Sequence, residues 1–429
     1  MKNSAIDNKN KIYIFLVLVY LIDTYFRTIF GSLMPKWEYC LVAIIFLFLI
    51  IMIFIKEEKI NFRRLDVLLL VLLFLVFIYS SLLSNLRNDT QFKSLLFQFI
   101  WFFTLYGYSS SIKNRSSLTM LRCNVIKVIF IFMLVCSIIN ILVYLIIGVL
   151  QVEVPFESLQ MLDFSYGRFQ GFIGNENLTG QLALLGILST LGLYFDHKLN
   201  YLVAFICVLI NSVVLYLTDS RASILAIIVC LIILFNSSIL NFFSSIKKKN
   251  KIIFYLFIML TTSIILFKIL GVRRISNLSF DSIELLLDNI TSERYSIWKE
   301  IIAISGIKPF YGLGVDNLLE AAKYYIGINS TIVKHSIVNA HNVFLELLYS
   351  SGIIGLSLGT LFFSNVLIIC KKMDLKDKKN LINICFVISV FIISLLDTGI
   401  FFGGPFITPV FWLFCGIVAN KCYLEINEL

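Results

Sequence analysis

Charged residues are scarce in this sequence. Only 14% of its 429 residues are Asp, Glu, Lys or Arg, whereas a soluble domain has about 25%. Proline is also rare, with five residues, while 59% of the chain is hydrophobic and the mean hydropathy is +0.92. So few charges exclude a soluble enzyme, and so much apolar content excludes disorder. The composition predicts a membrane protein that crosses the bilayer many times.

Several signatures of catalysis and transport are missing as well. The nine cysteines form no Cys-x-x-Cys pair, and neither a Gly-x-x-x-x-Gly-Lys loop nor a His-Glu-x-x-His motif occurs. These absences argue against a zinc site of the common kinds and against ATP-driven transport by this chain. Acidic pairs with metal-like spacing are missing from the predicted outer loops. No metal and no cofactor is therefore expected.

Long apolar stretches dominate what is present. A membrane span needs about 20 apolar residues, and this measure predicts about twelve spans. They lie at 12–30, 38–55, 65–84, 94–112, 124–150, 177–195, 200–217, 221–240, 251–270, 341–370, 381–400 and 405–424. Most of the 36 Lys and Arg fall on alternate connections, notably 56–64, 247–251 and 371–379. Because cytoplasmic loops collect basic residues, both termini are predicted to be cytoplasmic.

The predicted domain organisation is a single integral membrane domain, 1–429, with one large extracytoplasmic loop at 271–340, before the tenth span. Apolar stripes at 280–290 and 293–305 predict short amphipathic helices in this loop. Asp316 is expected to cap a third helix. Amphipathic helices beside a membrane lie on its surface or cover a cavity.

A small group of polar residues falls at the predicted outer surface, against the basic bias of the inner side. It comprises Arg168, Asn177, Arg221, Arg294, His341 and Asp397. Arg221 could serve as a snorkelling anchor, and Arg294 could stack on Trp298 one turn later. Ionisable groups at membrane depth are, however, candidates for function. Guanidinium groups bind phosphate oxygens in a forked geometry, so the group suits an anionic phosphate ligand.

Four sequence blocks contain these residues in a fixed order. They are Gly171-Phe-Ile-Gly-Asn-Glu-Asn-Leu-Thr-Gly, Ser220-Arg-Ala-Ser, Arg294-Tyr-Ser-Ile-Trp followed by Pro309-Phe-Tyr-Gly-Leu-Gly, and Asn339-Ala-His-Asn-Val-Phe-Leu-Glu-Leu-Leu-Tyr-Ser-Ser-Gly-Ile-Ile-Gly-Leu. The last block resembles the His-Asn signature of the O-antigen ligase/polymerase superfamily. With the other blocks, the resemblance covers about residues 165–365 and the plan of spans around a large outer loop.

The resemblance implies an all-α, C-type glycosyltransferase fold and a metal-independent glycosyltransferase. Its donor would be an oligosaccharide linked to undecaprenyl diphosphate, used on the outer face of the cell membrane. By position, His341 would be the catalytic residue, and Arg168 or Arg221, together with Arg294, would hold the diphosphate. Asn177 and Asn342 would complete the substrate-binding set. Asp316 or Glu320 of the outer loop is expected to orient His341.

Three functions remain open at this point. The first is a polymerase that joins lipid-linked repeat units into capsule, exopolysaccharide or O-antigen. The second is a ligase that transfers finished glycan to a lipid or protein acceptor, and the third is a flippase or exporter of lipid-linked sugars. A flippase would place charges through the middle of the membrane, whereas here they gather at one surface. The partners expected are the lipid bilayer and a flippase and chain-length regulator of the same pathway, with no nucleic acid.

Overall fold

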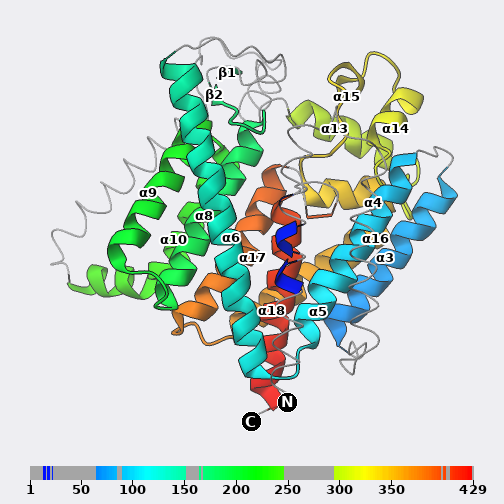
Figure 1. Cartoon of the computed structure of the whole chain (residues 1–429). Helices are drawn as coiled ribbons and strands as arrows, with labels where there is room; N and C mark the ends of the chain where they lie inside the picture. Colours follow the sequence, from blue (N-terminus) through cyan, green and yellow to red (C-terminus); the bar gives the residue numbers. More distant parts are fainter. Residues whose placement is uncertain are drawn as a thin grey trace.

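The computed structural model describes residues 13–15, 17–19, 22, 64–84, 89–150, 164–165, 168–245, 294–397, 400–401 and 406–427. These residues are mostly helical (Figure 1). The only strands among them form a two-stranded antiparallel pair, a small addition to the predicted all-α fold. The elements are α3 (Leu65–Leu83), α4 (Asp89–Ile100), the π-helix η1 (Trp101–Tyr106), α5 (Gly107–Ser111), α6 (Arg115–Val143), the π-helix η2 (Tyr144–Val149), β1 (Phe164–Ser165), β2 (Arg168–Phe169), α8 (Glu176–Phe195), α9 (Tyr201–Thr218), α10 (Arg221–Ser245), α13 (Arg294–Ser305), α14 (Leu318–Tyr325), α15 (Thr331–Lys334), α16 (Val343–Lys372), α17 (Lys378–Leu396) and α18 (Ile407–Asn427).

Seven helices in the described part of the chain are long and apolar enough to cross a membrane. They are α3, α6 with its extension to Ile146, α8, α9, α16, α17 and α18. Each coincides with a predicted span. The predicted spans at 38–55 and 251–270, most of 12–30, and the amphipathic helix at 280–290 lie outside the described residues. The total of twelve spans therefore stays a prediction.

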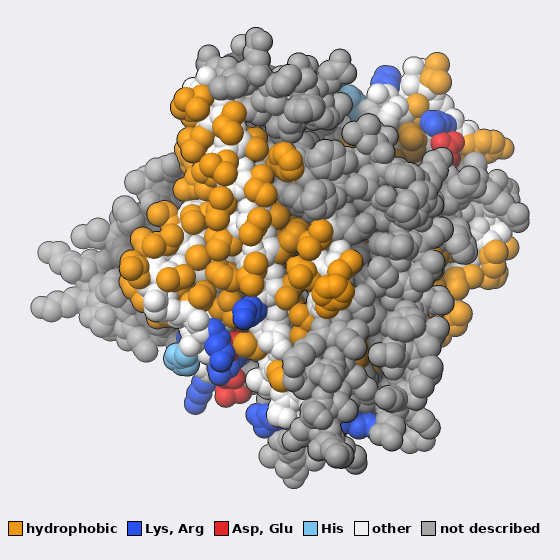
Figure 2. Space-filling view, in the orientation of Figure 1, with side chains coloured by type: hydrophobic (Ala, Val, Ile, Leu, Met, Phe, Trp, Pro, Cys, Tyr) orange, Lys and Arg blue, Asp and Glu red, His pale blue; other side chains and the backbone are white. Residues whose placement is uncertain are grey.

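The membrane helices differ in how much of their surface other helices cover. Helices α8, α17 and α18 are largely buried and form the centre of the helical array. Helix α9 instead exposes Leu202, Phe205 and Leu209 along one side, and α6 exposes Ile131 and Val135. Exposed apolar side chains on an apolar helix are those that contact lipid. Figure 2 shows a continuous hydrophobic face over this part of the molecule.

Helix α16 is broken at Gly352, where the prediction was one uninterrupted span. Gly352 has φ 66° and ψ −165°, a conformation that only glycine adopts readily. The loop after α13 enters this break. Leu313 and Gly314 donate to the carbonyls of Tyr349 and Ser350, and Ile353 and Ile354 donate to Pro309 and Phe310. Backbone that leaves the helical pattern at membrane depth must find such partners inside the protein.

Replacing Gly352 by alanine tests this arrangement. The added Cβ would collide with the carbonyl group of Phe310 in addition to straining the backbone. We expect the stability to fall by at least about 3 kcal/mol, because strain alone costs about 1–3 kcal/mol. The measurement is thermal unfolding of the purified protein in detergent. Gly174→Ala is the control, since Gly174 has φ +70° but open space around it; equal losses for the two variants would contradict the collision.

Three short helices form a cap at one end of the molecule, on the same side as the β pair (Figure 1). Helix α13 confirms the helix predicted at 293–305. Helix α14 follows Asp316 as predicted, but its N-cap is Asn317 and no side chain caps it, so the predicted cap by Asp316 is wrong. Ile297, Ile301 and Ile332 join these helices in a small core. Glu300 accepts hydrogen bonds from the side chain of Ser330 and the amides of Thr331 and Ile332. Burial raises the pKa of Glu300, but these hydrogen bonds together outweigh burial and leave the pKa below its ordinary value.

Candidate functional site

His341 lies just before α16, at the junction of the membrane helices and the cap. Its backbone has φ 50°, in the left-handed region that non-glycine residues seldom occupy. The next residue, Asn342, caps α16 by accepting from the amides of Phe344 and Leu345. Its side-chain amide also donates to the carbonyl of Leu395 near the end of α17. Asn342 therefore fixes the start of α16 beside the end of α17.

Ala340, the residue before His341, is held by hydrogen bonds to both its amide and its carbonyl. The amide of Ala340 donates to the carboxylate of Glu346 at 2.7 Å, and its carbonyl accepts from the indole of Trp298 at 3.0 Å. Glu346 is buried and also accepts from the hydroxyl of Tyr349. These bonds immobilise the chain that leads into His341. Backbone strain persists only where the surroundings fix it in this way, and such positions cluster at active sites.

Asp397 is the centre of the site. Its Oδ1 lies 3.3 Å from Nδ1 of His341 and 3.7 Å from a guanidinium nitrogen of Arg294. Its Oδ2 accepts from the amide of Gln181 on α8, at 3.2 Å. The Asp397 side chain is 4% exposed, that of Arg294 19% and that of His341 29%. The buried carboxylate of Asp397 thus contacts two partly exposed side chains, Arg294 of α13 and His341 at the start of α16.

The carboxylate beside His341 differs from the two that were expected. Asp316 accepts a hydrogen bond from Ser94, and Glu320 pairs with Lys323. The contact to His341 comes from Asp397, at the end of α17, 56 positions away along the chain. Helix packing brings these residues together, and their positions in the sequence do not indicate it.

Arg221 lies at the first residue of α10, in a turn that packs against α8. A Cβ on Gly180 would collide with Ser220, so α8 and this turn are in close contact. Asp219, the residue before Ser220, has φ 48°. Gly180 directly precedes Gln181, which donates to Asp397. The turn of Arg221 therefore adjoins the part of α8 that contacts the centre of the site.

Arg168 and Asn177 belong to the block before and within α8. Arg168 lies in β2, whose partner strand carries Ser165, and the structure does not describe its side chain. Asn177 is in the first turn of α8, which Asn175 caps. The intervening chain is held to α6, because the amide of Phe172 donates to Asn140. The backbone of this block thus lies near the same end of α8 as Gln181.

Two of the contacts at this site come from residues that sequence reasoning left out of the predicted site. Asp397 was noted only as a polar residue near the outer end of a span, and Gln181 was not singled out. The sequence signal for Gln181 is an amide side chain inside the predicted span 177–195, and the structure buries this side chain. Within the described ranges, no three His, Cys, Asp or Glu side chains gather as metal ligands would. The stretch Gly355-Leu-Ser-Leu-Gly has the spacing of a hydrolase nucleophile elbow but lies inside α16, whereas that motif requires a strand-to-helix turn.

Residues 202–359 match the O-antigen ligase family model. This match supports the resemblance of the chain to the O-antigen ligase/polymerase superfamily. The matched region contains Arg221, Arg294 and His341, and it ends inside α16. Arg168, Asn177 and Asp397 lie outside it. Comparison with curated proteins gave no match. The superfamily consists of glycosyltransferase-like membrane enzymes, and the resemblance seen in the sequence is confirmed.

Proposed function

We propose that this protein is a polysaccharide polymerase of this superfamily. It would join oligosaccharide repeat units linked to undecaprenyl diphosphate, without metal, on the outer face of the cell membrane. The observation that supports it most is the contact of Asp397 with both His341 and Arg294, because glycosyl transfer needs a proton acceptor and a cation close together. The family match covers both Arg294 and His341.

The cationic side chains would act on the leaving group. Breaking the bond between the sugar and the diphosphate leaves negative charge on the bridging oxygen. A guanidinium group fixed in place before the reaction stabilises that charge most where water is excluded. Arg294 is held by Asp397 and only 19% exposed, which suits this role. Arg221 would take the second phosphate, with Arg168, Asn177 and Asn342 nearer the sugars.

His341 would accept the proton of the acceptor hydroxyl. Histidine is the side chain that ordinarily exchanges protons near neutral pH. The Asp397 carboxylate faces Nδ1, so it favours the tautomer in which Nδ1 carries the hydrogen. Nε2 is then free of hydrogen and can act as the base. Asp397 is thus a positioning residue for His341 and for Arg294.

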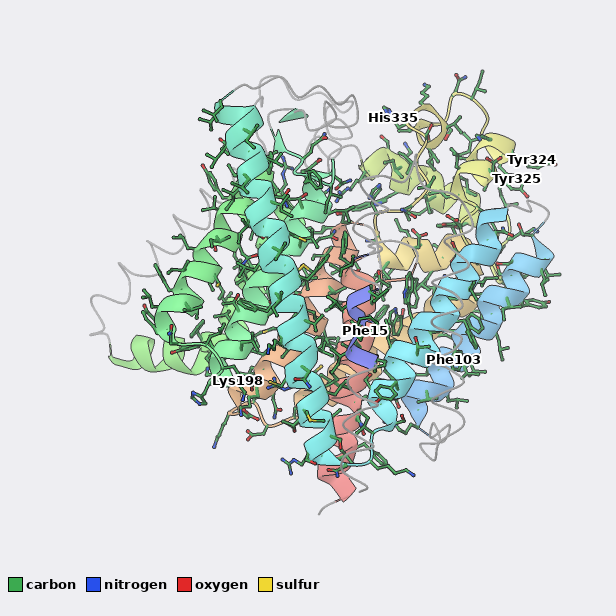
Figure 3. All side chains as sticks on the ribbon, in the orientation of Figure 1. Phe15, Phe103, Lys198, Tyr324, Tyr325 and His335 are labelled. Atoms are coloured by element: carbon green, nitrogen blue, oxygen red, sulfur yellow. The ribbon has the colours of Figure 1, made fainter. Side chains whose placement is uncertain are left out.

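The distribution of basic residues over the two ends of the molecule supports an extracytoplasmic site. Lys371, Lys372 and Lys379 lie at the ends of α16 and α17 that are remote from His341. Lys198, which follows α8, is at that same lower end in Figure 3, whereas His335 of the cap is at the upper end. Basic residues concentrate on the cytoplasmic side. We propose that the termini are cytoplasmic, that the site faces outward, and that the full chain has twelve spans.

The glycan of a deletion strain tests the function. A polymerase mutant should accumulate a single repeat unit on its acceptor, and the ladder of longer chains should disappear. The name of the matched family favours a second candidate, a ligase. Loss of a ligase would instead leave long polymer unattached to its acceptor. A normal, attached ladder in the deletion strain would contradict both functions.

Substituting Arg221 by lysine tests phosphate binding. Lysine keeps the positive charge but loses the forked geometry that holds two phosphate oxygens at once. We expect at least about a tenfold loss of polymerisation rate, expressed mainly as a higher KM for the lipid-linked donor. The measurement is elongation of lipid-linked repeats by the purified protein. Arg221→Gln should lose more than Arg221→Lys, and full activity of the lysine variant would contradict forked binding.

A further inference from the structure

A cavity of about 1120 Å³ lies at the opposite end of the molecule from His341. The first turns of α6, the α8–α9 connection and the start of α17 surround it. It lies beside the first turn of α17, whereas Asp397 follows the last. Helix α17 has 19 residues, and at 1.5 Å per residue the two sites are about 28 Å apart. The cavity is therefore separate from the proposed catalytic site.

The charges that line this cavity are mostly positive. Five basic residues face one carboxylate, in a lining that includes Arg115, Arg122, Lys127, Lys198, Lys379 and Asp196. Asp196 pairs with Arg122 in the interior and lies 3.8 Å from Lys379. The lining therefore carries a net positive charge. Lys127 and Lys198 are exposed in the rim, so the cavity attracts an anion.

Part of the remaining lining is apolar and continues into the lipid-facing surface. Phe130, Ile131 and Leu199 contribute to the wall, and Ile131 is 49% exposed. Val135 and Ile138 extend the same exposed side of α6 toward the middle of the membrane. Figure 2 shows Lys and Arg side chains gathered at the lower margin of this hydrophobic face. A ligand that fits both parts carries a negative headgroup next to an acyl chain.

We propose that this cavity binds the headgroup of an anionic phospholipid from the leaflet around the start of α6. Basic pockets between membrane helices bind acidic lipid headgroups in this way. The phosphate would lie among Arg115, Lys127 and Lys198, and the chains along Ile131 and Val135. The buried Arg122–Asp196 pair fixes the floor of the cavity and joins α6 to the end of α8.

The test is a titration of the purified full-length chain in detergent, followed by native mass spectrometry. The probes are dioctanoyl phosphatidylglycerol, dioctanoyl phosphatidylcholine and inorganic phosphate. The variant pair is Lys127→Gln with Lys198→Gln, and the control pair is Lys371→Gln with Lys372→Gln. The control lysines are exposed at the same end of the molecule but do not line the cavity. Thermal unfolding of each protein checks that it is folded.

We expect phosphatidylglycerol to bind at least tenfold more tightly than phosphatidylcholine. The cavity variant should lose about 25-fold in affinity for phosphatidylglycerol, since each basic residue near an anionic headgroup contributes about fivefold. The control pair should keep the affinity within about twofold. Equal affinities for the two lipids, or equal losses in the two variant pairs, would overturn the proposal. Binding of inorganic phosphate as tight as that of phosphatidylglycerol would overturn it in favour of a soluble anion.

Discussion

His341→Ala should abolish glycan elongation while the protein still folds. The variant removes the only side chain that the proposed mechanism assigns to the acceptor proton. General base catalysis contributes about 10²–10⁴-fold, so we expect kcat to fall by at least about 10²-fold. The KM for the donor should change little, since binding is assigned to the arginines. The measurement is the rate of polymer formation by purified protein on lipid-linked repeats.

The chain offers a matched control in His335. This histidine follows α15 in the cap, is exposed and lies in the same half of the molecule (Figure 3). His335→Ala should keep the full rate. The left-handed backbone at position 341 adds a second control, because His341→Asn keeps a residue that tolerates positive φ but cannot act as a base. If His341→Ala or His341→Asn elongates glycan at the normal rate, His341 is not the base.

The sequence predicts the membrane helices well because hydropathy is a local property. Helices α8, α9 and α17 begin and end within a few residues of the apolar runs at 177–195, 200–217 and 381–400. The start of α6 differs, at Arg115 rather than near 124, because Asn114 caps a polar first turn that hydropathy does not detect. Helix α13 also follows from its apolar stripe, whereas α14 was predicted from a cap at Asp316 that the structure does not have.

The break in α16 could not be predicted in the same way. Residues 341–370 are apolar throughout, so hydropathy indicates one continuous helix. Gly312 and Gly352 lie where two backbone segments approach closely. A Cβ on either residue would collide with the backbone around the other, so both positions require glycine. This close approach joins residues from two separate sequence blocks, Pro309-Phe-Tyr-Gly-Leu-Gly and Ser351-Gly-Ile-Ile-Gly. A pairing of this kind depends on the tertiary fold and has no local signature.

In the candidate site, too, the sequence indicates which residue types matter but not which residues contact one another. The misplaced charges of the sequence pointed to Arg294 and His341, and the structure brings both to one carboxylate. The partner of His341 was sought nearby in the outer loop, where Asp316 and Glu320 are. It is Asp397, since the end of α17 lies beside the start of α16, where Asn342 joins the two helices. Residue chemistry could be predicted, whereas the helix ends that share a site could not.

Asp397→Asn should lower kcat by about 10²–10⁴-fold, close to the loss in His341→Ala. Asparagine keeps the size of the side chain and the backbone bond to Ile393. Its amide can present a donor to Nδ1 of His341, which favours the tautomer that has no free base at Nε2; a comparable change in a His–carboxylate pair costs up to about 10⁴-fold. Arg294 loses its charge partner as well, so the KM for the donor should also change.

The controls for Asp397 separate positioning from folding. Asp374→Asn, at an exposed turn between α16 and α17, should keep normal activity. Asp397→Glu restores the charge at a displaced position and should recover part of the rate that Asp397→Asn loses. A purely structural carboxylate would instead lower the thermal unfolding temperature and the yield of folded protein in both Asp397 variants without a selective loss of kcat. A folded Asp397→Asn protein with normal kcat would show that His341 acts without this carboxylate, and the proposed tautomer would be wrong.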